Sequence, residues 1–354
     1  MSVSSATIQS NHRSEAPHRL QSLLFGQDST AGIVAVERLG PASVAIYTRG
    51  DDGTTTVTVE PFAPWLVAAS PDPWHEIVPD AEISELSGSQ PFRFLVRFPS
   101  WPAFTRAVVH PRADRDHYFR QPNPITQYLT ISGKTLFKSM TFEQVRRLQL
   151  DIETLGLDPT VPGAEVVMVA LRLGADEVVL RRDSSEADLL NALSAEINRL
   201  DPDVIEGHNI YNFDLPFLAA RAQRAGVRLP WGRDGSELWI ADEQRQFRAG
   251  PVSLPYRSAH ITGRHIIDTY QQIQRFDSSG RLTSYGLKPV IAELGLVRDD
   301  REFVSGDDIA DLWRQDPDRL ARYALDDVRD VDVLARVTLP TEFYQSQLLP
   351  LALE

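Results

Sequence analysis

The sequence predicts an α/β protein in which a smaller β-rich region precedes a larger domain of mixed strands and helices. The larger domain is indicated by apolar strands that alternate with amphipathic helices, an order typical of α/β folds. A length of 354 residues also suits two domains. The β-rich region is indicated by segments rich in β-branched and aromatic residues between turn signals, which cover 32–39, 43–49, 55–62 and 91–98.

Composition and capping signals place the domain boundaries. The first residues are polar, 50–53 suits a hairpin turn, 101–110 suits a short helix, and Thr141 can cap the next helical turn. The expected division has four parts: a mobile tail over 1–28, a β-rich amino-terminal domain over 29–140, an α/β domain over 141–340 and a short tail over 341–354.

The elements of the α/β domain follow from hydrophobic periodicity, with glycines as stop signals. They are, in order, a strand over 148–153, a hairpin over 165–182, a helix over 185–200, a strand at 204–205 with a helix that ends near Gly226, an extended hairpin over 232–262, and helices from about 284 onward.

Two acidic residues share one face of the first strand of this domain. Side chains alternate along a strand, so Asp151 and Glu153 point the same way while Leu150 and Ile152 point into the core. Two carboxylates arranged in this way can converge on one hard divalent cation, which prefers oxygen ligands. The same short pattern also suits an edge strand that carries two solvated acids.

Another acidic residue lies near the start of the helix that ends at Gly226. Asn209 occupies the exit of the preceding strand, and Asp214 follows where the helix begins. A carboxylate is favoured there by the helix dipole, so Asp214 is either an amino-terminal cap or a ligand of a site. Asn209 is either a turn residue or part of the same site.

The segment that opens after 316–317 is an amphipathic helix. At about 100° per residue its apolar arc includes Asp327 and leaves Asp326 outside as an expected solvated neighbour, with Asp330 near the edge as a rival. Because a carboxylate that faces packed surface is costly unless paired or metal-bound, Asp327 is the functional candidate. Tyr323 lies beside it at i−4, where it can hold an attacking water or serve as a core tyrosine.

Charge and composition narrow the class of function. A formal net charge of −13 argues against a broad duplex-binding groove and leaves room for a narrow single-strand site with weak, salt-sensitive binding. The absence of cysteine excludes disulfides, iron–sulfur clusters and thiolate zinc sites. No apolar run approaches the roughly 18 residues of a membrane span, and the start lacks a hydrophobic signal core. We therefore expect a cytoplasmic protein with no membrane partner.

In combination, the acidic segments resemble the proofreading 3′→5′ exonuclease domain of family B DNA polymerases, in the group with four acids and a tyrosine. The residues that match its motifs are Asp151-Ile152-Glu153, Asn209 through Phe213-Asp214, and Tyr323 through Asp327. Other segments also look like this family, namely 118–140, 229–239, 261–275, 284–296 and 339–351.

The resemblance implies a ribonuclease-H-like exonuclease fold, a mixed sheet flanked by helices, that removes nucleotides from a DNA 3′ end as nucleoside 5′-monophosphates. It implies two Mg²⁺ or Mn²⁺ ions held by four acids. Asp151, Glu153 and Asp327 would hold the ion that activates water, and Asp151 and Asp214 the ion at the leaving oxygen. Tyr323 would orient the attacking water together with Glu153.

The resemblance also implies substrate contacts by Thr154, Leu155, Asn209 and Phe213, and a single-stranded DNA or frayed primer 3′ end as the partner. The polymerase-palm motifs D-x-x-S-L-Y-P-S and D-T-D do not occur in the chain. We therefore expect no nucleotide addition, and a tail that leads toward a missing palm, supplied by a carboxyl-terminal half or a separate polymerase subunit. Alternative hypotheses are an RNA exonuclease of the same type and a non-catalytic DNA-binding or assembly module with a vestigial site.

Overall fold

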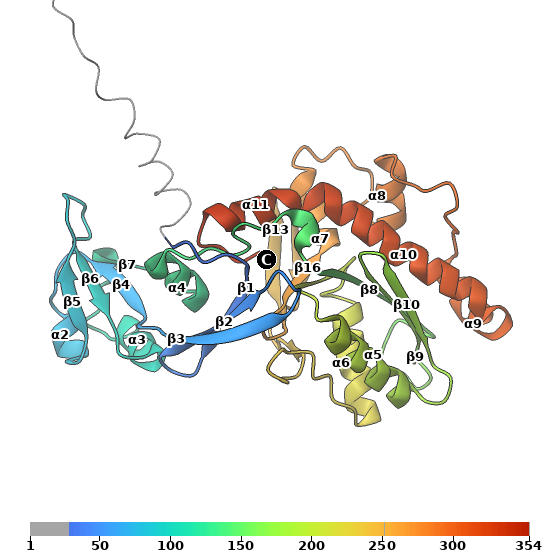
Figure 1. The fold of residues 1–354 in the computed structure, drawn as a ribbon, viewed down its shortest axis with the longest axis horizontal. Helices are drawn as coiled ribbons and strands as arrows, with labels where there is room; N and C mark the ends of the chain where they lie inside the picture. The colour runs from blue at the N-terminus through green and yellow to red at the C-terminus, as the bar shows by residue number, and fades with distance from the viewer. Residues whose placement is uncertain (1–27, 251, 354) are drawn as a thin grey trace, which may run out of the picture. The chain divides into compact units, whose positions relative to one another are not determined.

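The computed structural model describes residues 28–250 and 252–353, so nearly all of the tail expected over 1–28 lies outside the described residues. The described chain forms two compact units (Figure 1). The first contains the residues up to Ser139 together with Tyr344–Ala352, and the second contains Met140–Phe343. The helix α11 (Pro340–Leu348) occupies much of the stretch that was expected to be a short tail.

The amino-terminal unit is built on two antiparallel sheets, which confirms the prediction of a β-rich region. The first sheet has the order β1-β2-β3, with β1 (Ile33–Leu39), β2 (Ser43–Arg49) and β3 (Thr55–Pro61). The second has the order β5-β6-β4-β7, with β4 (Trp65–Ala68), β5 (Glu82–Glu85), β6 (Phe94–Arg97) and β7 (Tyr118–Arg120). The helices of this unit are α2 (Trp74–Ile77), α3 (Trp101–Val108) and α4 (Pro124–Ser132).

The larger unit is organised around a mixed five-stranded sheet of order β10-β9-β8-β11-β16. Neighbours β10, β9 and β8 are antiparallel, whereas β11 is parallel to both β8 and β16. The strands are β8 (Arg147–Thr154), β9 (Val166–Leu173), β10 (Asp176–Arg181), β11 (Val204–Gly207) and β16 (His265–Asp268). The helices are α5 (Glu186–Leu200), α6 (Asp214–Ala225), α7 (Thr269–Phe276), α8 (Leu287–Glu293), α9 (Ile309–Gln315) and α10 (Pro317–Thr338).

Helices cover both faces of this sheet (Figure 1), which confirms the predicted α/β, ribonuclease-H-like class. On one face, Leu150 and Ile152 of β8 are buried in a core shared with α5 and α6. On the opposite face, Met168 of β9 is buried against α10. Because Met168 is the cross-strand partner of Glu153, the acids Asp151 and Glu153 face α10.

The expected extended hairpin over 232–262 is present. It consists of a short outer pair, β12 (Trp239–Ile240) with β15 (Ala259–His260), and a longer inner pair, β13 (Arg245–Ala249) with β14 (Val252–Tyr256). Within the described residues, no helix is both long and apolar enough to cross a membrane.

Candidate active site

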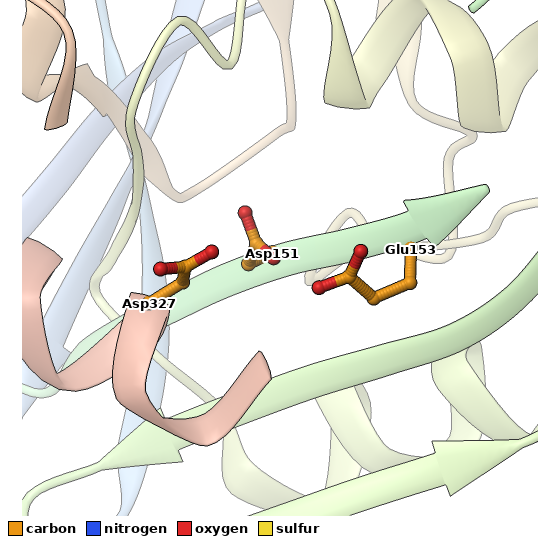
Figure 2. Close-up of side chains that lie close together, drawn as sticks. All are labelled: Asp151, Glu153 and Asp327. Atoms are coloured by element: carbon orange, nitrogen blue, oxygen red, sulfur yellow. The ribbon is translucent and has the colours of Figure 1, made fainter. Parts of the chain in front are cut away.

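Three carboxylates from two distant segments meet on the α10 side of the sheet (Figure 2). Asp151 and Glu153 come from β8 and Asp327 comes from α10, and each offers one oxygen within 4.8 Å of the others. Asp151 is half-buried, whereas Glu153 and Asp327 are buried. The strand period of two and the helix that covers this face therefore produce a compact set of oxygen donors.

Asp327 lies on helix α10, whose amino-terminal end is defined by a proline and a capping aspartate. Pro317 is its first residue, and the Asp316 carboxylate accepts a hydrogen bond from the Arg319 amide at 3.0 Å. The apolar stripe of the helix packs on the sheet through residues such as Ala324 and Val328. Asp327 follows Ala324 by three residues, so it lies on the same side of the helix and faces the sheet as well.

The three carboxylates strongly disfavour one another's charge. Burial raises the pKa of Asp151 well above its ordinary value, and the charges of Asp327 and Glu153 raise it further. Burial and the charge of Asp327 likewise raise the pKa of Glu153. One oxygen of Glu153, Oε1, is buried with no hydrogen-bond partner among the described residues. A divalent cation fits this donor set, since it would compensate both the repulsion and the unpartnered oxygen.

Asp214 is buried next to this group, although it is not one of the three converging acids. It is the first residue of α6, and its charge contributes to the raised pKa values of Asp151 and Glu153. Burial raises its own pKa to about 7. Asp214 is therefore close enough to be felt electrostatically, while its oxygens stand apart from the three-carboxylate group.

The turn that delivers Asp214 depends on an aspartate that sequence reasoning missed. Asp268, at the end of β16, accepts hydrogen bonds from the amides of Asn209 at 2.7 Å and Tyr270 at 2.9 Å. Asn209 has a φ of 67°, in the left-handed region that Asn tolerates better than most residues. The only signal in the sequence was an Asp at the end of an apolar strand followed by a helix, which reads equally well as an ordinary cap.

Tyr323 lies beside Asp327, as the i, i+4 spacing predicts, and its hydroxyl has two charged neighbours. Lys288 of α8 donates a hydrogen bond to the Tyr323 hydroxyl and another to the carbonyl of Val304 at 2.9 Å. The hydroxyl also hydrogen-bonds to Asp327. Burial and the nearby acids raise the Tyr323 pKa, so the phenol stays protonated and remains a donor. Lys288 was not predicted, although it is one of only three lysines in the chain.

The expectation that Asp326 is solvated is wrong. Asp326 is 4% exposed, pairs with Arg298 and Arg329, and accepts a hydrogen bond from the Glu302 amide at 3.0 Å. The helical arc described only the apolar side of α10. It contained no information about the segment 298–302, which folds over the other side and supplies arginines.

Asp330, the rival of Asp327, is also held by arginines and is not part of the converging group. It is 1% exposed, and its carboxylate pairs with Arg301 at 2.7 Å and with Arg298 at 3.3 Å. Arg301 pairs with Asp327 as well, so it links the candidate site to this second acidic cluster.

Three of the residues expected to contact the substrate lie next to the acids in the sequence. Thr154 and Leu155 are half-buried at the end of β8, where the Thr154 hydroxyl donates to the Gly156 carbonyl at 2.7 Å. Phe213 is half-buried immediately before Asp214, with its ring centroid 5.5 Å from that of Phe217. These side chains remain candidates for substrate contact.

The fold and the site define the class of protein, an α/β nuclease-like domain with a cluster of acids suited to a metal ion. The profile described as "DNA polymerase family B, exonuclease domain" matches residues 173–290. That range contains Asn209, Asp214 and Lys288, whereas the acids of β8 and α10 lie on either side of it.

Known proteins give the same result. The chain is 30% identical to a DNA polymerase of Pyrococcus glycovorans over 220 residues. This alignment covers 58% of this chain and 26% of that protein. It is 31% identical over 240 residues to DNA polymerase 1 of Pyrococcus abyssi, which covers 63% of this chain and 28% of that protein. The chain thus spans little more than a quarter of the length of these relatives.

A solved structure shares the fold over nearly the whole chain. The family B DNA polymerase of Pyrobaculum calidifontis matches with a TM-score of 0.68 at 20% identity, which covers 92% of this chain and 46% of that chain. The chain is therefore similar to family B DNA polymerases, and residues 173–290 match the exonuclease domain of that family.

Proposed function

We propose that the larger unit is a metal-dependent 3′→5′ exonuclease that removes nucleotides from DNA 3′ ends and releases nucleoside 5′-monophosphates. The observation that carries this proposal is the convergence of Asp151, Glu153 and Asp327 within 4.8 Å in a chain that matches a polymerase exonuclease domain (Figure 2). The proposed biological role is proofreading of a primer 3′ end that is extended by a polymerase region in the same or a separate chain.

The donor set favours hard divalent cations such as Mg²⁺ or Mn²⁺, because the converging group offers only carboxylate oxygens. We assign Asp151, Glu153 and Asp327 to one ion, and Asp151 with Asp214 to a second. The second assignment is supported by the position of Asp214, which influences the Asp151 pKa from outside the three-residue group. Bound ions would stabilise the charge that develops on the phosphate and make a water more acidic.

The protein's own groups then orient the nucleophile. The Tyr323 hydroxyl stays protonated and is held by Lys288, so it can present a fixed hydrogen-bonding group to a water near Asp327. Glu153, with its unpartnered Oε1, can accept a hydrogen bond from the same water. The positive charge of Lys288 also lowers the repulsion among the acids of the site.

Substrate binding by this chain is proposed to be local and weak. Thr154 and Leu155 follow Glu153 in the chain, and Phe213 precedes Asp214. Together with Asn209, they are assigned to the terminal nucleotides. The formal net charge of −13 opposes long contacts with a polyanion. A single-stranded or frayed 3′ end suits such a site better than a duplex.

The decisive experiment uses a 5′-labelled single-stranded DNA incubated with the protein in Mg²⁺, in Mn²⁺ or in EDTA. We expect a ladder that shortens from the 3′ end only with metal, and nucleoside 5′-monophosphates as products. The variant with Asp151→Ala and Glu153→Ala is the matched control for a contaminating nuclease. Faster cleavage of an RNA strand of the same sequence would favour the RNA exonuclease. Binding without cleavage in both metals would favour the non-catalytic module.

A further inference from the structure

Arg301 occupies an unusual position between the proposed metal site and the buried acids behind it. Its side chain is 1% exposed and lies on the irregular segment between α8 and α9. Its Nη2 group donates to Asp327 Oδ1, and its Nε group donates to Asp330 Oδ2 at 2.7 Å. One rigid guanidinium therefore bridges two carboxylates that lie one helical turn apart.

The aromatic rings around Arg301 limit its freedom further. The guanidinium carbon lies 5.4 Å from the ring centroid of Tyr323 and 5.1 Å from that of Phe303. A planar fork that is stacked on rings and hydrogen-bonded to two acids fixes the geometry of its partners better than a point charge does. The side chain of Asp327 is thereby restrained through its Oδ1 atom.

We propose that Arg301 is a positioning residue of the exonuclease site, which holds Asp327 in the orientation that faces Asp151 and Glu153. This inference rests on the proposed function, since it concerns a ligand of the proposed metal site. In this role Arg301 acts through Asp327 and not as a ligand of the metal or the substrate. It belongs to the class of outer partners that orient a metal ligand, and loss of such partners typically costs about 10–100-fold in metal affinity.

A competing effect has the opposite sign, which makes the proposal sharply testable. A cation beside a cation site repels the metal, so removal of Arg301 would strengthen metal binding if only its charge mattered. If Arg301 acts by positioning Asp327, its removal weakens metal binding in spite of the lost repulsion. The direction of the change in metal affinity therefore separates the two roles.

Arg298 provides a matched control. It belongs to the same segment and pairs with Asp326 and with Asp330 at 3.3 Å, and within the described residues it forms no ion pair with Asp327. Arg298→Gln and Arg301→Gln thus both remove one positive charge from the same acidic cluster. Only the second substitution removes the group that holds Asp327.

The experiment measures Mn²⁺ affinity of the full chain by titration, with free Mn²⁺ detected by electron paramagnetic resonance and folding monitored by circular dichroism. For Arg301→Gln we expect a loss of about tenfold or more in Mn²⁺ affinity. For Arg301→Lys we expect a smaller loss, because the charge stays while the fork is lost. For Arg298→Gln we expect an affinity within about twofold of wild type, because Arg298 pairs with Asp326 and Asp330 and not with the proposed metal ligand Asp327.

Unchanged or tighter Mn²⁺ binding by Arg301→Gln would overturn the proposal, and so would an equal loss in Arg298→Gln. If Arg301→Gln does not fold, Arg301→Lys decides, and wild-type affinity in that variant would likewise overturn the positioning role. Failure of the wild-type chain to bind Mn²⁺ would contradict the proposed function as well, whereas equal binding by wild type and variant contradicts only the role of Arg301.

Discussion

At the scale of single residues, folding brings buried carboxylates of the candidate site close together, where their charges repel one another. Burial and mutual repulsion raise the pKa values of Asp151 and Glu153, and one Glu153 oxygen has no hydrogen-bond partner among the described residues. Groups of this kind contribute little to the stability of the metal-free protein. A bound divalent cation would offset the unfavourable burial and repulsion of these carboxylates.

Replacement of both β8 acids tests this view. We expect Asp151→Ala with Glu153→Ala to abolish cleavage, because two proposed ligands are lost. The melting temperature in EDTA should stay the same or rise slightly, because the variant removes repulsion from the folded state. Thermal unfolding by circular dichroism and the labelled-strand assay provide the two readouts. A large fall in melting temperature would contradict the idea that these acids are strained.

Substitution of the neighbouring aspartates Asp326 and Asp327 on α10 should affect different properties, stability in one case and activity in the other. Asp327→Asn should lose about 10²-fold or more in activity, because a metal supplies several kcal/mol of transition-state stabilisation. Asp326→Asn should instead lose about 1.5–3 kcal/mol of stability, because a neutral amide replaces a buried carboxylate that accepts hydrogen bonds from two partly exposed arginines. Tyr323→Phe should retain an activity between those of wild type and Asp327→Asn.

Urea unfolding together with initial rates, measured at a temperature where all variants are folded, separates these outcomes. An inactive but stable Asp326→Asn beside an active Asp327→Asn would show that the two residues had been assigned the wrong way round.

At the scale of secondary-structure elements, a largely buried ion-pair network joins strands β8, β9 and β11 to α10. Arg147 of β8 pairs with Glu206 of β11 at 3.0 Å and with Asp332 of α10 at 2.6 Å. Arg172 of β9 also reaches Asp332, at 3.0 Å. The network lies on the same strand and the same helix that carry the acids of the site. It therefore fixes the register between β8 and α10 on which the convergence depends.

Loss of the central arginine should loosen this junction. We expect Arg147→Met to destabilise the larger unit by about 3–5 kcal/mol, because a buried ion pair that loses one partner leaves uncompensated carboxylates. Gln149→Leu is a milder comparison, since it removes a neutral group that donates to Glu206 at 2.8 Å. Urea unfolding measures both. Equal stability of Arg147→Met and wild type would show that the network contributes nothing to the junction.

At the scale of the whole molecule, the raised pKa values predict how stability depends on pH. The pKa of Asp214 is about 7 in the folded protein, against about 3.9 for an unfolded Asp. Between these values the folded state binds more protons than the unfolded state. This carboxyl therefore lowers the stability of the metal-free protein as pH rises, by up to about 1.4 kcal/mol per pH unit.

The test compares wild type with Asp214→Asn in EDTA from pH 5 to pH 8. The variant should gain stability over wild type as the pH rises, and excess Mn²⁺ should narrow the difference by binding the folded wild type. A difference that shrinks with rising pH in EDTA would have the wrong sign and would rule out a buried, pKa-raised Asp214.

The chain as a whole should degrade DNA and not extend it. Because the palm motifs of family B polymerases do not occur in this sequence, we expect no nucleotide addition to a primed template in Mg²⁺ or Mn²⁺. A gel assay with all four deoxynucleoside triphosphates tests this, with the Asp151→Ala and Glu153→Ala variant included so that degradation does not hide extension. Extended primers would contradict it.

Much of the organisation of this protein follows from local pattern in the sequence. The alternation along β8 places Asp151 and Glu153 on the face opposite Leu150 and Ile152, and the helical period places Tyr323 beside Asp327. These relations follow from the periods of strands and helices alone, so they do not depend on how the elements pack together. The α/β class follows from the same periodicities.

The tertiary structure alone decided which charged groups accompany the acids. Lys288 and Arg301 reach Tyr323 and Asp327 from segments 26 to 35 residues away in the chain, and Asp326 is buried because Arg298 folds over its side of α10. No periodicity within α10 contains this information. Whether a carboxylate on a helix is solvated, paired with an arginine or free for a metal depends on what the rest of the chain places against that helix, and only the folded structure specifies that.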